Sequence, residues 1–294
     1  MASLFQGSAV AIVTPFANGK VDVSALERLI EMQVAGGTTA IVACGTTGEP
    51  ATMTADEREL VVRTTVKIVN GRIPVIAGTG SNCTQSVIDA AARYADLGCA
   101  AQLVVTPYYN KTTQEGLYRH FMSVAENSAL PIIIYNVPGR TALDISPEVL
   151  DRLAACERFI GLKESSYNLP YVMEKVRRVG GRLAIYSGND DLVVPLMALG
   201  AEGVISVVSN ILPERMAEMT SSYLRGDHAT ALELQLTLLP LVRALFAEVS
   251  PIPCKAAMEM MGLCGGELRL PLVPISDENR AILRDALISS GVAL

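Results

Sequence analysis

The chain has 294 residues, which is long enough for two ordinary domains or for one large barrel. Half of its residues are hydrophobic and only 18% are charged, against a usual charged share of roughly 25%, so extensive disorder is excluded. The formal charge of −6 argues against a nucleic-acid-binding surface, which needs clustered Lys and Arg. The two histidines, His120 and His228, are too few for a histidine-based metal site.

The six cysteines are scattered without a Cys-x-x-Cys pair, so we expect small buried hydrophobic residues rather than disulfide partners. The first residues carry no basic segment, and no apolar run reaches the ~18 residues of a membrane span. We therefore expect a cytoplasmic protein with no nucleic-acid partner and no membrane partner.

Eight short apolar runs, rich in β-branched residues, recur along the chain up to about residue 207. Each run is too short for a helix and too uniformly apolar for a strand with one wet face, which predicts strands buried on both faces. The runs span residues 8–13, 40–44, 73–78, 102–106, 131–135, 159–163, 183–187 and 203–207.

Helix signals separate these runs. Alternating strands and helices predict a parallel sheet, and eight such units predict closure into an α/β fold of the (β/α)8 TIM-barrel type. An open doubly wound sheet is the alternative topology. The expected helix starts are Asp22 or Ser24, Thr54 with Glu57 in a capping box, Thr84, and Ser146 followed by Pro147.

The alternation stops after a helical pattern at about 213–226. Residues 227–294 contain three further helical patterns joined by apolar connectors. We therefore predict a catalytic barrel over residues 1–226 and a C-terminal all-helical appendage over residues 227–294.

The ends of the predicted strands carry the candidate chemistry, because the active site of such a barrel lies at the carboxyl ends of its strands. Lys163 ends the sixth run, whereas the other five lysines lie in helix or loop patterns beside polar residues. Burial disfavours the charged form of an amine, and a neutral amine attacks carbonyl carbons to form a Schiff base. The alternative is a lysine that pairs with a carboxylate such as Glu164 or extends into solvent.

Tyr135 ends the run before Lys163, so its phenol can lie near the lysine amine and shuttle protons. The alternative is a core tyrosine whose hydroxyl bonds a backbone carbonyl. The stretch GTTGE at 45–49 can place backbone N–H groups and the hydroxyls of Thr46 and Thr47 around an anion, or it is a plain turn. Arg140, in a Pro-Gly-Arg loop, can bind a carboxylate through two hydrogen bonds, or it is a surface arginine.

Two motifs suggest cofactors that we do not expect. The stretch GTGSNC at 78–83 follows a strand like a dinucleotide fingerprint, but Cys83 stands where the third glycine belongs. Asp190 and Asp191 could suggest a metal, yet without histidine support we expect them to begin a helix. No cofactor and no metal is therefore predicted.

Six strand-end motifs together resemble the pyruvate-dependent class I aldolase/lyase family: GTTGE, VTPYYNK, YNVPGRT, GLKES, SGND and GVISV, in this order. The resemblance covers essentially the whole chain, including SPIPCK at 250–255. Within the family, the motifs are similar to the branch that condenses pyruvate with aspartate semialdehyde in lysine and diaminopimelate biosynthesis. The resemblance implies a homotetramer built from two tight dimers.

The resemblance also implies a role for each matching residue. Lys163 would form the Schiff base with pyruvate, and Tyr135 would donate and accept its protons. Thr46 would connect Tyr135 to Tyr109, which would reach in from a neighbouring subunit. The substrate contacts would be Thr46 and Thr47 at the pyruvate carboxylate, Arg140 at the carboxylate of aspartate semialdehyde, and Gly188 and Ile205 through their backbone.

One departure concerns regulation. Lysine-inhibited members of the family commonly carry histidines after the GTTGE segment and an acid in the helix that follows the GTGxN turn. The corresponding positions here are Ala55, Arg58 and Ser86, although Asn82 and Tyr108 of that regulatory cleft match. We therefore expect inhibition by lysine to be weak or absent.

Two other functions stay open. An N-acetylneuraminate lyase or a keto-deoxy-sugar-acid aldolase would use the same lysine and tyrosine. Arg140 and Tyr109 favour the synthase branch, because sugar-acid lyases tend to lack that arginine. A ligand-binding barrel that has lost catalysis is disfavoured by the presence of Lys163, Tyr135 and Thr46.

Overall fold

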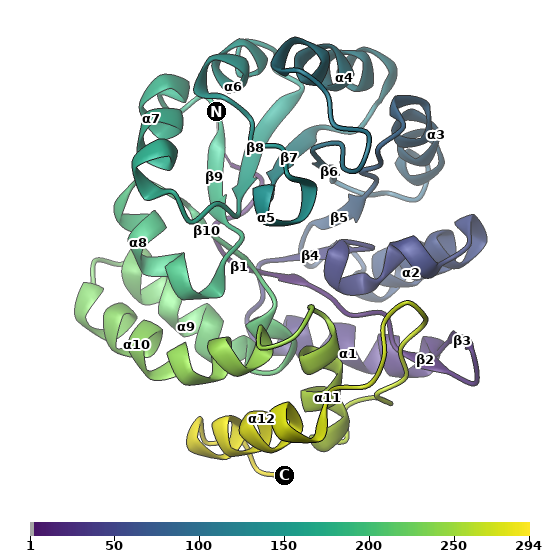
Figure 1. The fold of residues 1–294 in the computed structure, drawn as a ribbon, viewed down its shortest axis with the longest axis vertical. Helices are drawn as coiled ribbons and strands as arrows, with labels where there is room; N and C mark the ends of the chain where they lie inside the picture. Colours follow the sequence, from purple (N-terminus) through teal and green to yellow (C-terminus); the bar gives the residue numbers. More distant parts are fainter. Residues whose placement is uncertain (1–2) are drawn as a thin grey trace.

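A closed barrel of eight parallel strands forms the centre of the computed structural model, which describes residues 3–294 (Figure 1). Residues 1 and 2, at which the predicted catalytic barrel begins, lie outside the described residues. The barrel strands are β1 (Gly7–Ala11), β4 (Ala40–Ala43), β5 (Val75–Gly78), β6 (Ala101–Val105), β7 (Ile132–Asn136), β8 (Phe159–Glu164), β9 (Ala184–Ser187) and β10 (Gly203–Ser206).

The barrel closes because β1 pairs in parallel with both β4 and β10. The short strands β2 (Phe16–Ala17) and β3 (Lys20–Val21) form a separate antiparallel pair. Each predicted run overlaps one barrel strand and agrees with its limits to within two residues. The (β/α)8 fold is confirmed, and the open-sheet alternative is wrong.

Helices surround the barrel and continue beyond it. The C-terminal helices of the predicted fold class are present, and Figure 1 shows the last of them outermost at the edge of the molecule. The helices are α1 (Val23–Ala35), α2 (Ala55–Val69), α3 (Thr84–Ala95), α4 (Gln114–Asn127), α5 (Pro138–Thr141), α6 (Pro147–Leu153), α7 (Leu169–Val179), α8 (Val193–Ala198), α9 (Pro213–Leu224), α10 (His228–Leu245), α11 (Ile252–Met260) and α12 (Asp277–Ser289).

Three of the predicted helix starts are confirmed by their capping hydrogen bonds. The Asp22 side chain accepts from the third residue of α1, and the Ser146 side chain does the same for α6. At α2, Thr54 and Glu57 form both hydrogen bonds of the capping box. Each cap satisfies a backbone N–H that the helix leaves without an internal partner.

The fourth predicted start, Thr84, is confirmed without a capping hydrogen bond. Thr84 is the first residue of α3 rather than its cap, and the N-cap position is held by Cys83 without a side-chain hydrogen bond. The Thr84 hydroxyl lies 2.9 Å from Nδ1 of His120 on α4. The hydroxyl of this first helical residue therefore makes a tertiary contact with the neighbouring helix.

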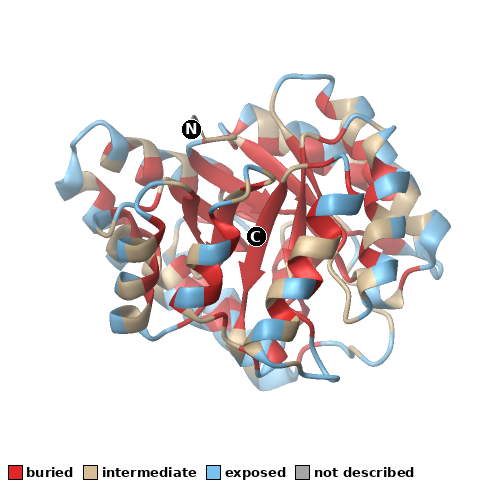
Figure 2. Cartoon of the chain, turned by 90° about the horizontal axis from the view of Figure 1, so that it is seen from above, coloured by how far each residue is buried: buried red, intermediate tan, exposed pale blue. Residues whose placement is uncertain are grey.

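Successive strand residues point to opposite faces of the barrel wall and so belong to two different hydrophobic clusters. One cluster fills the barrel interior and includes Ala9, Ala11 and Tyr135. The other lies between the strands and the helices and includes Val10. Figure 2 shows the outcome, with buried strands at the centre and exposed outer faces on the helices.

The N-terminal segment closes the barrel interior at the amino ends of the strands. Phe5 stacks on Tyr186 of β9 with ring centroids 4.2 Å apart, and the Tyr186 hydroxyl donates to the Phe5 carbonyl at 3.0 Å. Because this end is filled by aromatic rings, the opposite mouth is left as the place for a substrate.

The outer cluster runs on from the barrel helices into the C-terminal helices, where it includes Ile252, Leu283 and Leu287. The predicted boundary between residues 226 and 227 falls in the link between α9 and α10. The division into two domains stays a prediction, because the two parts share this cluster.

The cysteines follow the expectation only in part. Cys44, Cys99 and Cys254 are buried, whereas Cys83 is exposed, and all six cysteines are free thiols. Burial raises the pKa of Cys44 to about 12, as expected for an unreactive core thiol. No helix in the described part of the chain is both long and apolar enough to cross a membrane.

His120 makes the stability of the fold depend on pH. Burial lowers the pKa of His120 from 6.5 to about 4, so the folded chain holds the ring neutral where the unfolded chain protonates it. This stability is present above pH 6.5 and is lost as the pH falls toward 4, by about 3 kcal/mol at roughly 1.4 kcal/mol per pKa unit.

We expect His120→Asn to flatten that part of the pH dependence. Urea unfolding at pH 7 and pH 4 should show a loss of stability on acidification that is about 3 kcal/mol smaller in the variant than in the wild type. Carboxylates titrate in both proteins, so their contribution to the loss of stability cancels in the comparison. Equal losses in the two proteins would contradict the prediction.

Candidate active site

A cavity of about 380 Å³ opens beside the carboxyl ends of the barrel strands. It receives residues from the turn after β4, from the ends of β6 and β7, from α5 and from the C-terminal appendage. Its lining includes Thr46, Tyr108, Tyr135 and Arg140 from the barrel, and Val249, Ser250, Pro251, Pro271 and Leu272 from the appendage. The appendage therefore forms one wall of the site.

Lys163 and Tyr135 lie side by side at this mouth because they are register partners on neighbouring strands. The Lys163 ammonium lies 4.4 Å from the centroid of the Tyr135 ring. The two residues are only 5% and 7% exposed. The Tyr135 hydroxyl has no hydrogen-bond partner among residues 3–294. The alternative considered for Tyr135, a core tyrosine whose hydroxyl bonds a backbone carbonyl, is instead found at Tyr186.

The carboxylate nearest to Lys163 in the sequence does not neutralise it. Glu164 points to the other side of β8, where its Oε2 lies 2.9 Å from the Nζ of Lys175 on α7. The same ammonium lies 2.6 Å from Asp144, and Asn136 donates to both carboxylates. Asn136 and Glu164 are register partners, and each directly follows Tyr135 or Lys163 on its strand. The network therefore lies next to the Tyr135–Lys163 pair along β7 and β8.

The position of Lys163 at a strand end was predicted, whereas the burial of two other lysines was not. Lys175 and Lys255 are fully buried, and each is paired with a carboxylate. Among the described residues, Lys163 has no carboxylate within ion-pair distance, which distinguishes it from both. The apolar stretch IPCKAAMEMM around Lys255 was the available signal, because a lysine there has no polar helix face to occupy.

The GTTGE segment contains the 3₁₀ helix Thr46–Gly48 (η1), and Glu49 joins it to a second 3₁₀ helix, Pro50–Thr52 (η2). The hydroxyl of Thr14 donates to the Gly48 carbonyl at 2.7 Å and ties the first of them to the segment after β1. Thr46 is exposed and lines the cavity, whereas Thr47 is buried and outside its lining. Lys163 is likewise buried and outside this lining.

Arg140 lies on α5, which stands over the barrel mouth (Figure 1). Its Nη2 donates to the Ser250 carbonyl of the appendage at 3.1 Å, and no carboxylate pairs with it in the part of the chain described. The guanidinium is exposed and lines the cavity, so its other donors are free to bind an anion.

Gly188 lies against Lys163, and Ile205 lies in the barrel interior; neither lines the cavity. A Cβ atom at Gly188 would lie 3.0 Å from Cε of Lys163 and would overlap the Ser165 hydroxyl. Only glycine therefore fits beside the lysine stem. Ile205 is fully buried in the interior cluster that contains Tyr135.

Tyr109 is not part of the cavity of its own chain. It is 92% exposed, and its φ of 67° lies in the left-handed region that bulky side chains rarely adopt. Its neighbour Tyr108 lines the cavity, and the Asn82 carbonyl accepts from Asn110 at 3.0 Å. Arg58, which the resemblance assigned to the same regulatory cleft as Tyr108, also lines the cavity.

Asp190 and Asp191 begin the 3₁₀ helix Asp190–Leu192 (η3) ahead of α8, as predicted. The burial of Asp190 was not predicted. Its Oδ2 accepts from the backbone N–H groups of Val207 and Val208, at 2.9 and 3.2 Å, and burial raises its pKa. Across residues 3–294, no three His, Cys, Asp or Glu side chains gather in a group that could hold a metal ion.

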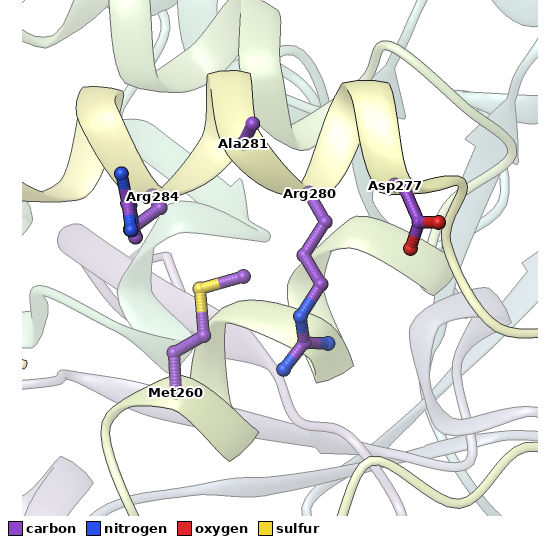
Figure 3. A pocket seen from close by; sticks show the side chains of 5 residues that line it. All are labelled: Met260, Asp277, Arg280, Ala281 and Arg284. Atoms are coloured by element: carbon purple, nitrogen blue, oxygen red, sulfur yellow. The ribbon is translucent and has the colours of Figure 1, made fainter.

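A second cavity, of about 340 Å³, lies on the appendage between α11 and α12 (Figure 3). Arg280 and Arg284 extend from α12 toward Met260 at the end of α11. Arg280 is already paired with Glu259, and no strand end contributes to the lining. This cavity therefore offers none of the chemistry found at the barrel mouth.

The fold and the site define the class first: a (β/α)8 barrel with a buried lysine beside a tyrosine at its strand ends. The family model described as the dihydrodipicolinate synthetase family matches residues 4–289, and the chain belongs to this family.

Individual relatives agree over nearly the full length. A 4-hydroxy-tetrahydrodipicolinate synthase of Thermoanaerobacter sp. is 49% identical over 290 residues, which cover 98% of each chain. The crystal structure of dihydrodipicolinate synthase from Aquifex aeolicus superposes with a TM-score of 0.96 at 47% identity, covering 99% of each chain.

The chloride-inhibited dihydrodipicolinate synthase of Acinetobacter baumannii, solved with pyruvate, gives a TM-score of 0.96 at 44% identity and covers 98% of this chain and 99% of its own. These relatives are synthases, which places the chain among enzymes of the lyase class and does not favour the sugar-acid lyase alternative.

Proposed function

We propose that the chain condenses pyruvate with L-aspartate-4-semialdehyde, as a 4-hydroxy-tetrahydrodipicolinate synthase of lysine and diaminopimelate biosynthesis. One observation carries the proposal: a buried lysine amine without a carboxylate partner faces a tyrosine ring 4.4 Å away beside the cavity. The synthase names of relatives that match the full length support the same reaction.

The proposed chemistry starts at the Lys163 amine. Its lone pair adds to the keto carbon of pyruvate, and loss of water leaves an iminium that withdraws electrons from the adjacent methyl group. The methyl group then loses a proton, and the resulting carbon nucleophile adds to the aldehyde carbon of the second substrate. Tyr135 is positioned to give and take protons in these steps.

The two carboxylates of the proposed substrates would be held at separate places. Thr46 and Thr47, with the backbone N–H groups of their turn, would bind the carboxylate of pyruvate. Arg140 would bind the carboxylate of aspartate semialdehyde at the cavity entrance. Gly188 and Ile205 would shape the pocket around Lys163, and no metal or cofactor is assigned to the reaction.

The proposal includes a homotetramer, as a dimer of dimers, in which Tyr109 from a neighbouring subunit joins Thr46 and Tyr135. The 92% exposure of Tyr109 supports this role, because a tyrosine serving its own chain would not project into solvent from a strained backbone. We place the enzyme in the cytoplasm, as expected for biosynthesis from small metabolites.

Weak or absent inhibition by lysine is also part of the proposal. Asn82 and Tyr108 are retained, but Ala55, Arg58 and Ser86 replace the histidines and the acid expected of lysine-inhibited members. An arginine at position 58 would repel the ammonium groups of lysine.

A substrate comparison tests the proposal. The wild type should turn over pyruvate with aspartate semialdehyde and should not cleave sugar acids. Arg140→Ala should raise the KM for aspartate semialdehyde by roughly ten- to a hundredfold, the scale of a lost hydrogen bond between charged groups. Arg119→Ala is the matched control, because it removes an exposed arginine of α4 that does not line the cavity. It should leave the KM for aspartate semialdehyde unchanged.

Preferred cleavage of a sugar acid would overturn the proposed function. An unchanged KM for aspartate semialdehyde in Arg140→Ala would remove Arg140 from its proposed role. Trapping of pyruvate should persist in Arg140→Ala, because Arg140 is assigned to the second substrate only.

A further inference from the structure

The C-terminal appendage meets the GTTGE segment through one buried ion pair. Lys255 of α11 and Glu49, the residue that joins η1 to η2, approach to 2.5 Å between Nζ and Oε1. Their side chains are 0% and 1% exposed. A buried charge that loses its partner is strongly destabilising, so each residue constrains the place of the other.

The two partners are not equally anchored. The Lys255 ammonium also donates to the Glu267 carbonyl at 2.9 Å and lies 4.1 Å from the centroid of the Phe16 ring. The Glu49 carboxylate has no hydrogen bond from any other described residue. Lys255 is therefore held by several contacts, and the position of Glu49 follows from it.

The backbone of Glu49 connects the ion pair to the predicted anion-binding turn at Thr46 and Thr47. Glu49 has φ of 55° and ψ of 41°, a left-handed conformation that is unfavourable for a residue with a Cβ atom. Its N–H donates to the Thr46 carbonyl at 3.1 Å and thereby closes η1. A side chain fixed from outside the turn offsets the cost of this conformation.

A second contact from the appendage reaches the same part of the chain. Arg269 donates to the Thr52 carbonyl at 3.1 Å and pairs with Glu57 at the start of α2. It lies 4.2 Å from the centroid of the Phe16 ring that Lys255 also contacts. The segment from Glu49 to Glu57 is thus held from the appendage at both of its ends.

We propose that Lys255 and Glu49 are positioning residues: through their ion pair the appendage sets the conformation of the Thr46–Thr47 turn and hence its affinity for a substrate carboxylate. The identity of that carboxylate rests on the proposed function, whereas the conformation of the turn does not. Burial lowers the pKa of Lys255 and Glu49 opposes this change, so the charge of the ammonium depends on the pair as well.

The test uses the full-length protein and the variants Lys255→Met, Glu49→Gln and the combination of both. Leu283→Ala is the control, because Leu283 is a fully buried residue of α12 whose truncation lowers stability without removing a partner of Glu49. Besides the melting temperature, two quantities are measured: hydrogen exchange of residues 45–52, and the pyruvate concentration that half-saturates borohydride trapping on Lys163.

Each single variant should accelerate exchange at residues 45–52 and raise the half-saturating pyruvate concentration about tenfold, the scale of one weakened hydrogen bond to a charged group. The double variant should recover part of the melting temperature, because no charge is left unpaired, but should keep the weak pyruvate binding. Leu283→Ala should change neither quantity. Glu49→Gln, which keeps the shape of the side chain, decides the matter if Lys255→Met does not fold.

The proposal is overturned if the paired variants stay within about twofold of the wild type in both measurements, or if Leu283→Ala of equal melting temperature reproduces their changes. Failure of pyruvate to trap the wild type would overturn the proposed function instead. In that case the exchange of residues 45–52 still decides whether the ion pair holds the turn.

Discussion

Lys163→Ala is expected to abolish the covalent adduct that borohydride forms with pyruvate and to lower kcat by roughly 10⁴-fold or more. A residue that carries a covalent intermediate has no substitute within its site, so its removal costs several orders of magnitude. Mass spectrometry of peptides from the trapped wild type should locate the adduct on Lys163.

Two controls separate this effect from a loss of charge or of fold. Lys163→Arg keeps a positive charge at the strand end but cannot form the adduct, so it should be as inactive as Lys163→Ala. Lys67→Ala removes an exposed lysine near the end of α2 and should leave activity unchanged. An adduct on another lysine, or full activity in Lys163→Ala, would refute the assigned chemistry.

Lys175→Met is expected to be strongly destabilising. It leaves Glu164 buried without its cation, and breaking a buried pair in this way costs about 3–5 kcal/mol. For a chain of this length the melting temperature should fall by on the order of 10 °C. Activity should fall at temperatures where the variant is folded, because Glu164 and Asn136 directly follow Lys163 and Tyr135 on their strands.

Thermal unfolding of Lys175→Met beside Lys67→Met measures the effect. The exposed Lys67 has no buried partner, so its substitution should stay within about 0.5 kcal/mol of the wild type. Adding Glu164→Gln to Lys175→Met should restore part of the stability, since the unpaired charge is then removed. A melting temperature of Lys175→Met close to that of Lys67→Met would show that the network contributes little to the fold.

The barrel and the central pair of its site were predictable because their signals are local. Uniformly apolar runs at regular spacing predicted the strands, and the end of a run predicted which face of the barrel Lys163 and Tyr135 would occupy. Tyr135 and Lys163 are register partners on β7 and β8. Their proximity was already indicated by their positions at the ends of successive runs.

The other residues of the site were harder to place because their positions depend on distant segments. The motif presents Thr46 and Thr47 as equivalent, yet Thr46 is exposed at the cavity and Thr47 is buried. The helix start at Thr84 was predicted, but the contact of its hydroxyl with His120 on the next helix was not. Nothing in the local pattern shows that the appendage supplies Ser250 and Pro271 to the cavity wall.

The sequence by itself determined the (β/α)8 class, the strand ends on which the chemistry lies, and the family to which the motifs belong. These features follow from hydrophobic periodicity and from residue order, which are properties of the chain before it folds. The tertiary structure alone decided which of three buried lysines lacks a carboxylate. Lys175 and Lys255 are neutralised by Glu164 and Glu49, which lie 11 and 206 positions away, and only folding brings such partners together.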